Sequence, residues 1–448
     1  MSEKSSPKNN VVSEIVKKNL CCGCGSCAGI CPANALTMKL NKLGEYQPIE
    51  SDIHKCTNCG LCLSICPFNS KKINPHELWE NCCYNTPIIG PHCGTYVGYS
   101  LKERQRLTGA SGGVATWFVQ KLLELGWVDS VICVGKYTSS PFRLFHVCKT
   151  PQDLQNSSTS SYYPVELSSI LRYIKNNPGN YAITALPCLA KALRHAANKL
   201  PWLKERMKYI IGLVCGGQRG TFFAQYLAQK HGIAPEHLKG LQFRVKNETK
   251  TANNFGLSFL MTNNESKTIY RHDGMDSVWY RKWFMLNSCQ FCEDVFADYA
   301  DISFMDAWLD GYRDDYRGHS LWIIRNQQLA TLLDKPSDLK VSDISPELVC
   351  KSQDGLINYK INLIKTRCYL AHSLGQNVPI YMSKEKTNLG FRKNMRVKNE
   401  MKRLLASSRI FAGTNSVPEF EAKMKKYDII ESIINLPVKV YMKIRKFA

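Results

Sequence analysis

Two short cysteine runs constrain the fold of this chain more than any other feature. Each run reads C-x2-C-x2-C-x3-C-P, and the prolines that close them are Pro32 and Pro67. This spacing holds paired [4Fe–4S] clusters: three thiolates of one run bind one cluster, and the fourth binds the other. The spacing therefore assigns two sets of ligands, Cys21, Cys24, Cys27 and Cys66 to one cluster and Cys31, Cys56, Cys59 and Cys62 to the second.

The alternatives to clusters are a zinc site and a disulfide framework. Zinc sites usually show two spaced cysteine pairs rather than two runs of four. The first residues, Met1 to Asn10, lack the apolar stretch of a signal peptide, and no apolar run approaches the length of a membrane-spanning helix. We therefore expect a cytoplasmic protein of a reducing, anaerobic cell, whose cysteines bind metal rather than form disulfides. Cys22 lies outside the pattern and is expected to be a packed neighbour.

Hydrophobic periodicity divides the 448 residues into three regions. Residues 1–75 are expected to form a small ferredoxin-like module that carries two clusters. Residues 76–330 are expected to form an α/β domain with two parts, 76–165 and 166–330. Residues 331–448 predict a basic, mostly helical extension. The fold class is therefore α+β for the module and α/β for the larger domain.

Helical and strand patterns alternate along the α/β domain. Periodicity predicts helices over 113–125, 165–175, 189–197 and 221–231, and strands over 128–134, 181–186 and 209–214. Three further strands, over 241–245, 257–261 and 267–270, flank Asn-rich turns and predict an antiparallel insertion. A small hairpin is expected within 38–53. The alternation predicts a sheet covered by helices, with strand ends gathered at one edge.

Four dispersed cysteines are expected to meet at that edge. Cys188 and Cys215 each follow a predicted strand, and Cys289 and Cys292 form a C-x2-C pair. Four thiolates suit either a third [4Fe–4S] cluster or a tetrahedral zinc ion. The connector between the regions holds further thiols and a histidine without ligand spacing, which are expected to pack or lie on the surface; they are Cys82, Cys83, Cys93 and His92.

Ser111, Gly112 and Gly113 precede the helix predicted over 113–125. Their backbone N–H groups and the positive end of the helix dipole suit a phosphate or pyrophosphate. Thr116 adds a hydroxyl group one turn into the helix. Plain helix capping is the alternative, because serine and glycine are common at helix starts.

The combination of these motifs resembles the family of coenzyme F420 hydrogenase/dehydrogenase β-subunits. The resemblance runs from about residue 19 to residue 325. It rests on the two cysteine runs, on 111–116 (SGGVAT), on 186–188 (LPC), on 213–217 (LVCGG), on 289–292 (CQFC) and on 300–308 (ADISFMDAW). The resemblance implies a flavin-binding α/β domain with FAD, a third [4Fe–4S] cluster on the dispersed cysteines, and electron flow through the ferredoxin-like module.

Three departures from the family pattern concern the cofactor side. Residues 159–162 read Thr-Ser-Ser-Tyr where the family usually has Gly-Ser-Lys-Tyr. The resemblance assigns Ser160 and Tyr162 to the cofactor site, but the missing lysine leaves binding of coenzyme F420 open. Residues 185–186 are Ala-Leu rather than Gly-Thr, and Met305 replaces a glycine. Intact cluster ligands beside altered cofactor residues indicate a different substrate.

The charge of the chain bears on its partners. Its net charge is +22, and residues 384–448 contribute 16 Lys or Arg against 6 Asp or Glu, a net +10. A basic surface favours an acidic electron carrier such as a ferredoxin, or peripheral contact with anionic membrane. Aromatic residues interleave sparsely in this region, so nucleic acid is not an expected partner.

The expected function is that of an oxidoreductase. Electrons would pass between a ferredoxin-type carrier and FAD, and as hydride between FAD and coenzyme F420 or another small organic substrate. No side chain stands out as a catalytic acid. The alternative is a non-catalytic electron-transfer subunit that connects to a partner dehydrogenase, hydrogenase or reductase.

Overall fold

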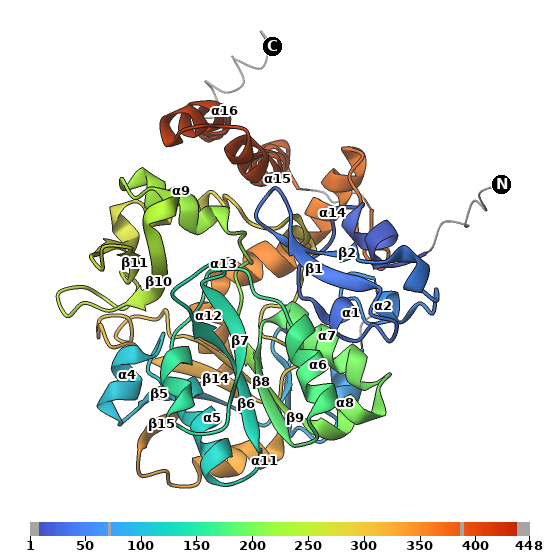
Figure 1. Ribbon diagram of the computed structural model, residues 1–448. Helices are drawn as coiled ribbons and strands as arrows, with labels where there is room; N and C mark the ends of the chain where they lie inside the picture. Colours follow the sequence, from blue (N-terminus) through green and yellow to red (C-terminus); the bar gives the residue numbers. More distant parts are fainter. Residues whose placement is uncertain (1–8, 70–72, 386–388, 437–448) are drawn as a thin grey trace.

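The computed structural model describes residues 9–69, 73–385 and 389–436 (Figure 1). The ferredoxin-like module begins with a short π-helix and contains a hairpin and two one-turn helices. The predicted hairpin is confirmed. The elements up to the α/β domain are η1 (Val12–Val16), α1 (Ser26–Gly29), β1 (Leu36–Leu40), β2 (Tyr46–Glu50), η2 (Ile53–Lys55), α2 (Leu61–Ser64), α3 (Pro75–Leu78), β3 (Tyr84–Thr86) and β4 (Gly90–His92).

An eight-stranded mixed sheet lies at the centre of the α/β domain, in the order β15-β5-β14-β13-β9-β8-β6-β7. Four neighbours, β13, β9, β8 and β6, are mutually parallel, and antiparallel strands flank them on both sides. The strands are β5 (Gly94–Ser100), β6 (Ser130–Lys136), β7 (Arg143–Cys148), β8 (Tyr181–Ala185), β9 (Met207–Leu213), β13 (Ile302–Asp306), β14 (Ser320–Ile324) and β15 (Leu339–Asp343).

Side-chain alternation along the strands gives the sheet two apolar faces. In β6, Val131 and Cys133 join one buried cluster with Trp117 and Phe118 of α5, whereas Ile132 points into the cluster that contains α6 and α7. The helices around the sheet are α4 (Glu103–Thr108), α5 (Val114–Glu124), η3 (Asp153–Ser157), α6 (Ser168–Asn176), α7 (Pro187–Ala197), α8 (Pro201–Arg206), α11 (Gln327–Ala330), η7 (Thr331–Leu333), α12 (Pro346–Ser352), α13 (Asp354–Ile357) and η8 (Asn358–Asn362).

The ferredoxin-like module shares its apolar core with the α/β domain. Cys24 and Cys27 belong to the same buried cluster as Leu171 of α6. The Leu167 N–H donates to the Cys24 carbonyl oxygen at 2.9 Å. Gly25 has φ +77°, and a Cβ there would lie 2.2 Å from a carboxylate oxygen of Glu166. Only glycine satisfies both the backbone conformation and this close approach.

A second, three-stranded antiparallel sheet, β10-β11-β12, confirms the predicted insertion. Its strands are β10 (Leu238–Val245), β11 (Gly256–Met261) and β12 (Ser266–Tyr270), and the neighbouring helices are α9 (Phe222–Lys230), η4 (Pro235–His237), η5 (Arg271–Asp273), α10 (Met275–Tyr280) and η6 (Asn287–Phe291). The C-terminal helices are α14 (Ile364–Ser373), α15 (Phe391–Ala412) and α16 (Val417–Asn435).

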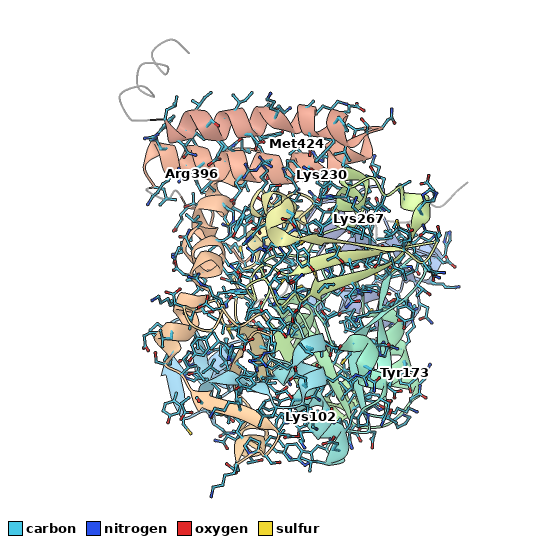
Figure 2. All side chains as sticks on the ribbon, turned by 90° about the vertical axis from the view of Figure 1, so that its left-hand side faces the viewer. Lys102, Tyr173, Lys230, Lys267, Arg396 and Met424 are labelled. Carbon is cyan, nitrogen blue, oxygen red and sulfur yellow. The ribbon has the colours of Figure 1, made fainter. Side chains whose placement is uncertain are left out.

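Helices α15 and α16 form an antiparallel pair above α9 (Figures 1 and 2). Figure 2 shows Arg396 and Met424 on this pair and Lys230 on α9 beneath it. Buried aromatic rings join the pair to the α/β domain, with Phe420 packing against Tyr226 at a centroid distance of 5.3 Å. Lys230 Nζ also pairs with Glu421 at 2.7 Å.

Most predicted elements are confirmed to within about three residues, but β15 is not a predicted strand. It lies beyond residue 330, in the region expected to be mostly helical, and pairs antiparallel with β5. At the edge of the sheet only Leu339 of its five side chains is buried, so the sequence lacks a clear strand pattern. The division into domains remains a prediction. None of the described helices has the length and apolar character needed to span a bilayer.

Replacing Phe411 with alanine tests how the helical pair is held. Its ring packs against Phe222, Phe284 and Phe420 at centroid distances between 5.1 and 5.4 Å. The substitution should weaken the packing of α15 and α16 on the α/β domain by about 3–5 kcal/mol of free energy. Hydrogen exchange should accelerate across both helices and not in the large sheet. Phe391→Ala, at a position 48% exposed in the same helix, is the control. Equal exchange in the two variants would contradict this packing.

Candidate functional site

The first cysteine group lies where the module meets the α/β domain. The charges of Cys24 and Cys66 act on Cys21 and Cys27, so the four thiols predicted as one ligand set are neighbours. Burial raises the pKa of Cys66 to about 12 and also raises the pKa of Cys21 and Cys27. Burial therefore favours the protonated form of these three thiols, whereas the hydrogen bond from Cys22 lowers the pKa of Cys24, the fourth of the set. The Gly23 N–H donates to the Cys21 sulfur at 3.4 Å.

The second cysteine group lies at the surface of the module. The charges of Cys59 and Cys31 act on Cys62. These three cysteines and Cys56, the four predicted ligands, line one pocket. Cys59 is exposed. The Ala35 N–H donates to the Cys31 sulfur at 3.4 Å. Such N–H···S contacts help to set cluster potentials.

The third group is assembled by the sheet edge and by η6. Cys188 follows β8, Cys215 follows β9, and Cys289 and Cys292 stand at η6. The charges of the other three act on Cys289, and the charges of Cys188 and Cys215 act on Cys292. Burial raises the pKa of Cys292 to about 11. The structure thus brings together the four cysteines that the sequence predicted to converge.

The donor set of the third group fits a cluster better than a single ion. Among the described residues, no three metal-binding side chains converge closely enough to hold one metal ion. In a [4Fe–4S] cubane each thiolate binds a different iron, so its four sulfurs surround a larger group. Backbone N–H groups also point at the sulfurs, from Gly217 to Cys215 at 3.4 Å and from Gln218 to Cys289 at 3.3 Å.

Cys22 lies between the first and third groups. Its thiol hydrogen-bonds with Cys188 of the third group and with Cys24 of the first. Nothing in the local sequence predicts more than packing at this position. Cys22 therefore links one predicted ligand of the first group to one of the third.

Buried cations surround the third group, and sequence reasoning missed them. Lys360, from η8, is 1% exposed. Its Nζ donates to the Cys292 sulfur at 3.4 Å and to the Asp294 carbonyl oxygen at 2.6 Å. Arg219 is 4% exposed, and the charges of Cys289 and Cys215 act on it. Isolated Lys and Arg in a sequence carry no signal of burial.

The loop before α5 is held by its own neighbours. The Ser111 hydroxyl donates to the His319 carbonyl oxygen at 2.5 Å, and the Gly113 N–H donates to the Ser111 carbonyl oxygen at 2.7 Å. Gly113 is the N-cap of α5 and provides no side-chain cap for the first-turn N–H groups. Thr116 lies one turn on, half-buried. The N–H groups of Gly112 and Gly113 thus already donate to backbone carbonyl oxygens, of Arg317 and Ser111, and only the first-turn N–H groups of α5 lack a side-chain cap.

Tyr162 packs in an aromatic cluster beside a buried guanidinium group. Its ring is 4.9 Å from that of Trp279 and 5.4 Å from that of Phe243. Burial raises the pKa of Tyr162, while the charge of Arg244 opposes the shift. Ser160 is half-buried in the same segment.

Arg244 lies between the aromatic cluster around Tyr162 and the loop before α5. Its Nη2 donates to the Ala110 carbonyl oxygen at 2.8 Å, and it forms a short ion pair with Asp306. Arg244 has φ +60° at an irregularity in the β10–β11 pairing. Non-glycine residues in this region are uncommon and tend to mark functional sites. Among the described residues, its Nη1 and the buried Ser161 hydroxyl have no hydrogen-bond partner.

Cations outnumber carboxylates around the loop. Lys246 Nζ donates to the carbonyl oxygens of Arg106 and Arg317, both at 2.5 Å. Asp315 pairs with Arg106 at 2.8 Å and with Arg317 at 3.0 Å. Burial, reinforced by the charge of Arg244, lowers the pKa of Lys246 to about 7.

The connector cysteines lie apart from these groups. Cys82 and Cys93 have their sulfurs 3.5 Å apart, and both contact the Arg325 carbonyl oxygen. Cys83 is exposed, and His92 Nδ1 is 3.0 Å from the Gly90 carbonyl oxygen. The hairpin β3–β4 explains why these residues gather despite their irregular spacing.

Comparison with known families divides the chain into three matches. Residues 20–70 match a 4Fe-4S dicluster domain. Residues 95–172 match the N-terminal part of the coenzyme F420 hydrogenase/dehydrogenase beta subunit, and residues 179–347 match its C-terminal part. The matches confirm the iron–sulfur character of the module. They end before η8.

Three proteins from methanogens are similar to this chain. Coenzyme F420-dependent sulfite reductase of Methanocaldococcus jannaschii is 25% identical over 307 residues, 65% of this chain but only 43% of that protein. A subunit of the F(420)H(2) dehydrogenase of Methanosarcina mazei is 22% identical over 302 residues, 65% of this chain and 77% of that protein. A chain of the F420-reducing [NiFe] hydrogenase complex from Methanosarcina barkeri has a similar fold, with a TM-score of 0.51 and 15% identity over 66% of this chain and 99% of that one.

Replacing Arg244 with methionine tests how much its contacts with Asp306 and Ala110 stabilise the protein. The variant leaves Asp306 without its partner and the Ala110 carbonyl oxygen without its donor. Breaking a buried pair costs about 3–5 kcal/mol. Arg313→Met removes a cation whose side chain is 48% exposed and pairs with the exposed Asp310, and should cost at most about 1 kcal/mol. Anaerobic thermal unfolding followed by circular dichroism measures both. Equal midpoints would show that the Arg244 contacts contribute little.

Proposed function

This chain belongs to the family of coenzyme F420 hydrogenase/dehydrogenase β-subunits, and we propose that it is an iron–sulfur flavoprotein oxidoreductase. In this proposal it carries three [4Fe–4S] clusters and FAD. It passes electrons between a ferredoxin-type carrier and FAD, and exchanges hydride with coenzyme F420 or another organic substrate. The names of the similar proteins support this substrate class. Two of the names mention F420, and the third mentions its reduced form, F(420)H(2).

The arrangement of the cysteine groups is the observation that carries the proposal. The second group lies at the surface, with Cys59 exposed, and the first group adjoins the third at Cys22. We assign the three groups, in that order, to a path from the surface to the sheet edge. Apolar packing around Cys24 and Cys27 excludes water from the middle of the path. FAD, when bound, supplies the exchange between single electrons and hydride.

We propose that FAD binds between the loop before α5 and the aromatic cluster around Tyr162. The proposed contacts are Ser111, Gly112, Gly113, Thr116, Ser160 and Tyr162. Four cations, Arg106, Arg244, Lys246 and Arg317, face two carboxylates, Asp306 and Asp315. The three guanidinium groups exceed the two carboxylates by one charge, and Lys246, whose pKa is about 7, adds up to one more, which suits a pyrophosphate. The unpartnered Arg244 Nη1 supports the same assignment among the described residues.

A second candidate function is an electron-transfer subunit without its own substrate. The names of two similar proteins, one from a dehydrogenase and one from a hydrogenase complex, favour this role. The chain also spans less than half of the sulfite reductase that it matches. A larger partner would then supply the substrate site. Ser161, at the position of the family's usual lysine, leaves both roles open.

Turnover by the isolated chain distinguishes the two functions. Anaerobically purified protein should contain about one FAD and should reduce a viologen dye with the reduced form of coenzyme F420 as donor. Lys246→Met should lower FAD occupancy, because it removes one of the proposed pyrophosphate cations. Gly112 makes a poor probe, since a Cβ there would lie 2.8 Å from the Ser320 backbone nitrogen. Full FAD without turnover of coenzyme F420 favours the subunit role, and absence of FAD excludes the proposed flavoprotein.

Iron content tests the proposed third cluster. Three [4Fe–4S] clusters require about 12 iron atoms per chain. The double variant Cys289→Ser, Cys292→Ser should retain about 8, because it removes two of four proposed ligands. Cys83→Ser, which alters an exposed connector thiol, should retain about 12. About 8 iron atoms in the wild type, unchanged in the double variant, would exclude the third cluster.

Charge reversal on the helical pair tests the proposed acidic carrier. Lys402 of α15 and Lys425 of α16 are exposed, and deletion of the helices would expose buried aromatic rings. Lys402→Glu with Lys425→Glu should slow reduction by an acidic ferredoxin and flatten its dependence on salt, because long-range attraction is screened as the Debye length falls from about 30 Å to about 8 Å. Lys204→Glu with Lys208→Glu is the matched control. An unchanged rate together with lost binding to anionic vesicles would instead mean membrane contact.

A further inference from the structure

Lys360 reaches the third cysteine group from outside the part of the chain that matches the family. The family match ends at residue 347, and Lys360 lies in η8, a π-helical turn of Asn358–Asn362. Single π-helical turns are often found at functional sites. The Lys360 side chain is buried, and its Nζ donates to the Cys292 sulfur at 3.4 Å. Few lysines are buried in proteins without a compensating anionic group.

The surroundings of the ammonium group supply that compensation. The Lys360 Nζ lies 3.4 Å from the sulfur of Cys292, which becomes a thiolate when it binds iron, and beside Asp294. The Asp294 carbonyl oxygen accepts a second hydrogen bond at 2.6 Å. Arg219 is a second cation that lies against thiols of the same group. The single carboxylate of Asp294 therefore does not balance both Lys360 and Arg219. Lys360 and Arg219 thus both direct positive charge at sulfur.

We propose that Lys360 raises the reduction potential of the third cluster. The inference rests on the proposed function, since it requires that the four cysteines hold a [4Fe–4S] cluster. One-electron reduction, by a chemical reductant such as dithionite, adds one negative charge beside Cys292 and transfers no proton. A fixed ammonium group in a dry environment stabilises that added charge more than the oxidised state. Lys360 is a positioning residue, because it acts through a ligand sulfur.

The consequence concerns the third cluster itself. A raised potential makes it a better electron acceptor than it would be without the Lys360 charge. The C-terminal segment, which the family match does not cover, thereby adjusts a centre that lies inside the family fold. This role gives residues 354–362 a function beyond packing.

The test is an anaerobic redox titration followed by electron paramagnetic resonance. Lys360→Met removes the charge and keeps the length of the side chain. We expect the midpoint potential of the third cluster to shift to more negative values, while the signals of the first two clusters stay in place. Lys360→Arg should restore most of the wild-type potential. Lys365→Met, at an exposed position one helix further on, is the control and should leave all potentials unchanged.

Iron analysis keeps the possible failures apart. An unchanged third-cluster potential in Lys360→Met with about 12 iron atoms overturns the inference and leaves the proposed function intact. About 8 iron atoms and no third signal in the wild type mean instead that the proposed function has failed at its third cluster. If Lys360→Met loses that cluster, Lys360→Gln keeps a hydrogen-bond donor without charge and should show the lowered potential. Loss of the cluster in both variants overturns the inference in favour of a role in assembly.

Discussion

Contact between the first cysteine run and helix α6 is the interaction on which the rest of the site depends. The Leu167 N–H bonds to the Cys24 carbonyl oxygen, and Gly25 allows the two backbones to approach closely. Because the thiols on either side are buried in a core shared with the α/β domain, the module cannot separate without exposing apolar surface. The same contact brings Cys22 against Cys188. The fold thereby fixes the spacing between redox centres, which a flexible linker would leave variable.

Buried positive charges come together at two places in the structure. Around the loop before α5, carboxylates offset only part of the charge of Arg244 and its neighbours. Around the third cysteine group, Lys360 and Arg219 face thiols. Burial of an unbalanced cation costs several kcal/mol, so both places are stabilised when an anionic group binds. Both places can therefore be understood as suited to an anionic group, which in the proposed function is FAD at the first and an iron–sulfur cluster at the second.

The sequence predicts much of this arrangement because its motifs are local or periodic. Ligand spacing assigns the two cysteine runs, and strand ends assign Cys188 and Cys215 to one edge. Those inferences need only the geometry of short segments. Arg244 and Lys360 escape prediction because their importance comes from tertiary contacts with residues about 60 or more positions away. The strand β15 escapes for a related reason, since its pairing with β5 rather than its own pattern defines it.

The C-terminal region is more closely integrated than its composition suggests. A basic, helical extension suggests an appendage that a partner or membrane would recognise. Yet Tyr381 donates a hydrogen bond to the Pro67 carbonyl oxygen at 3.1 Å, next to Cys66 of the first group. Lys360 reaches Cys292 of the third. One segment thus hydrogen-bonds beside Cys66 of the first group and to Cys292 of the third, two residues more than 200 positions apart in sequence. A change in the position of this segment would therefore alter the surroundings of Cys66 and Cys292 together.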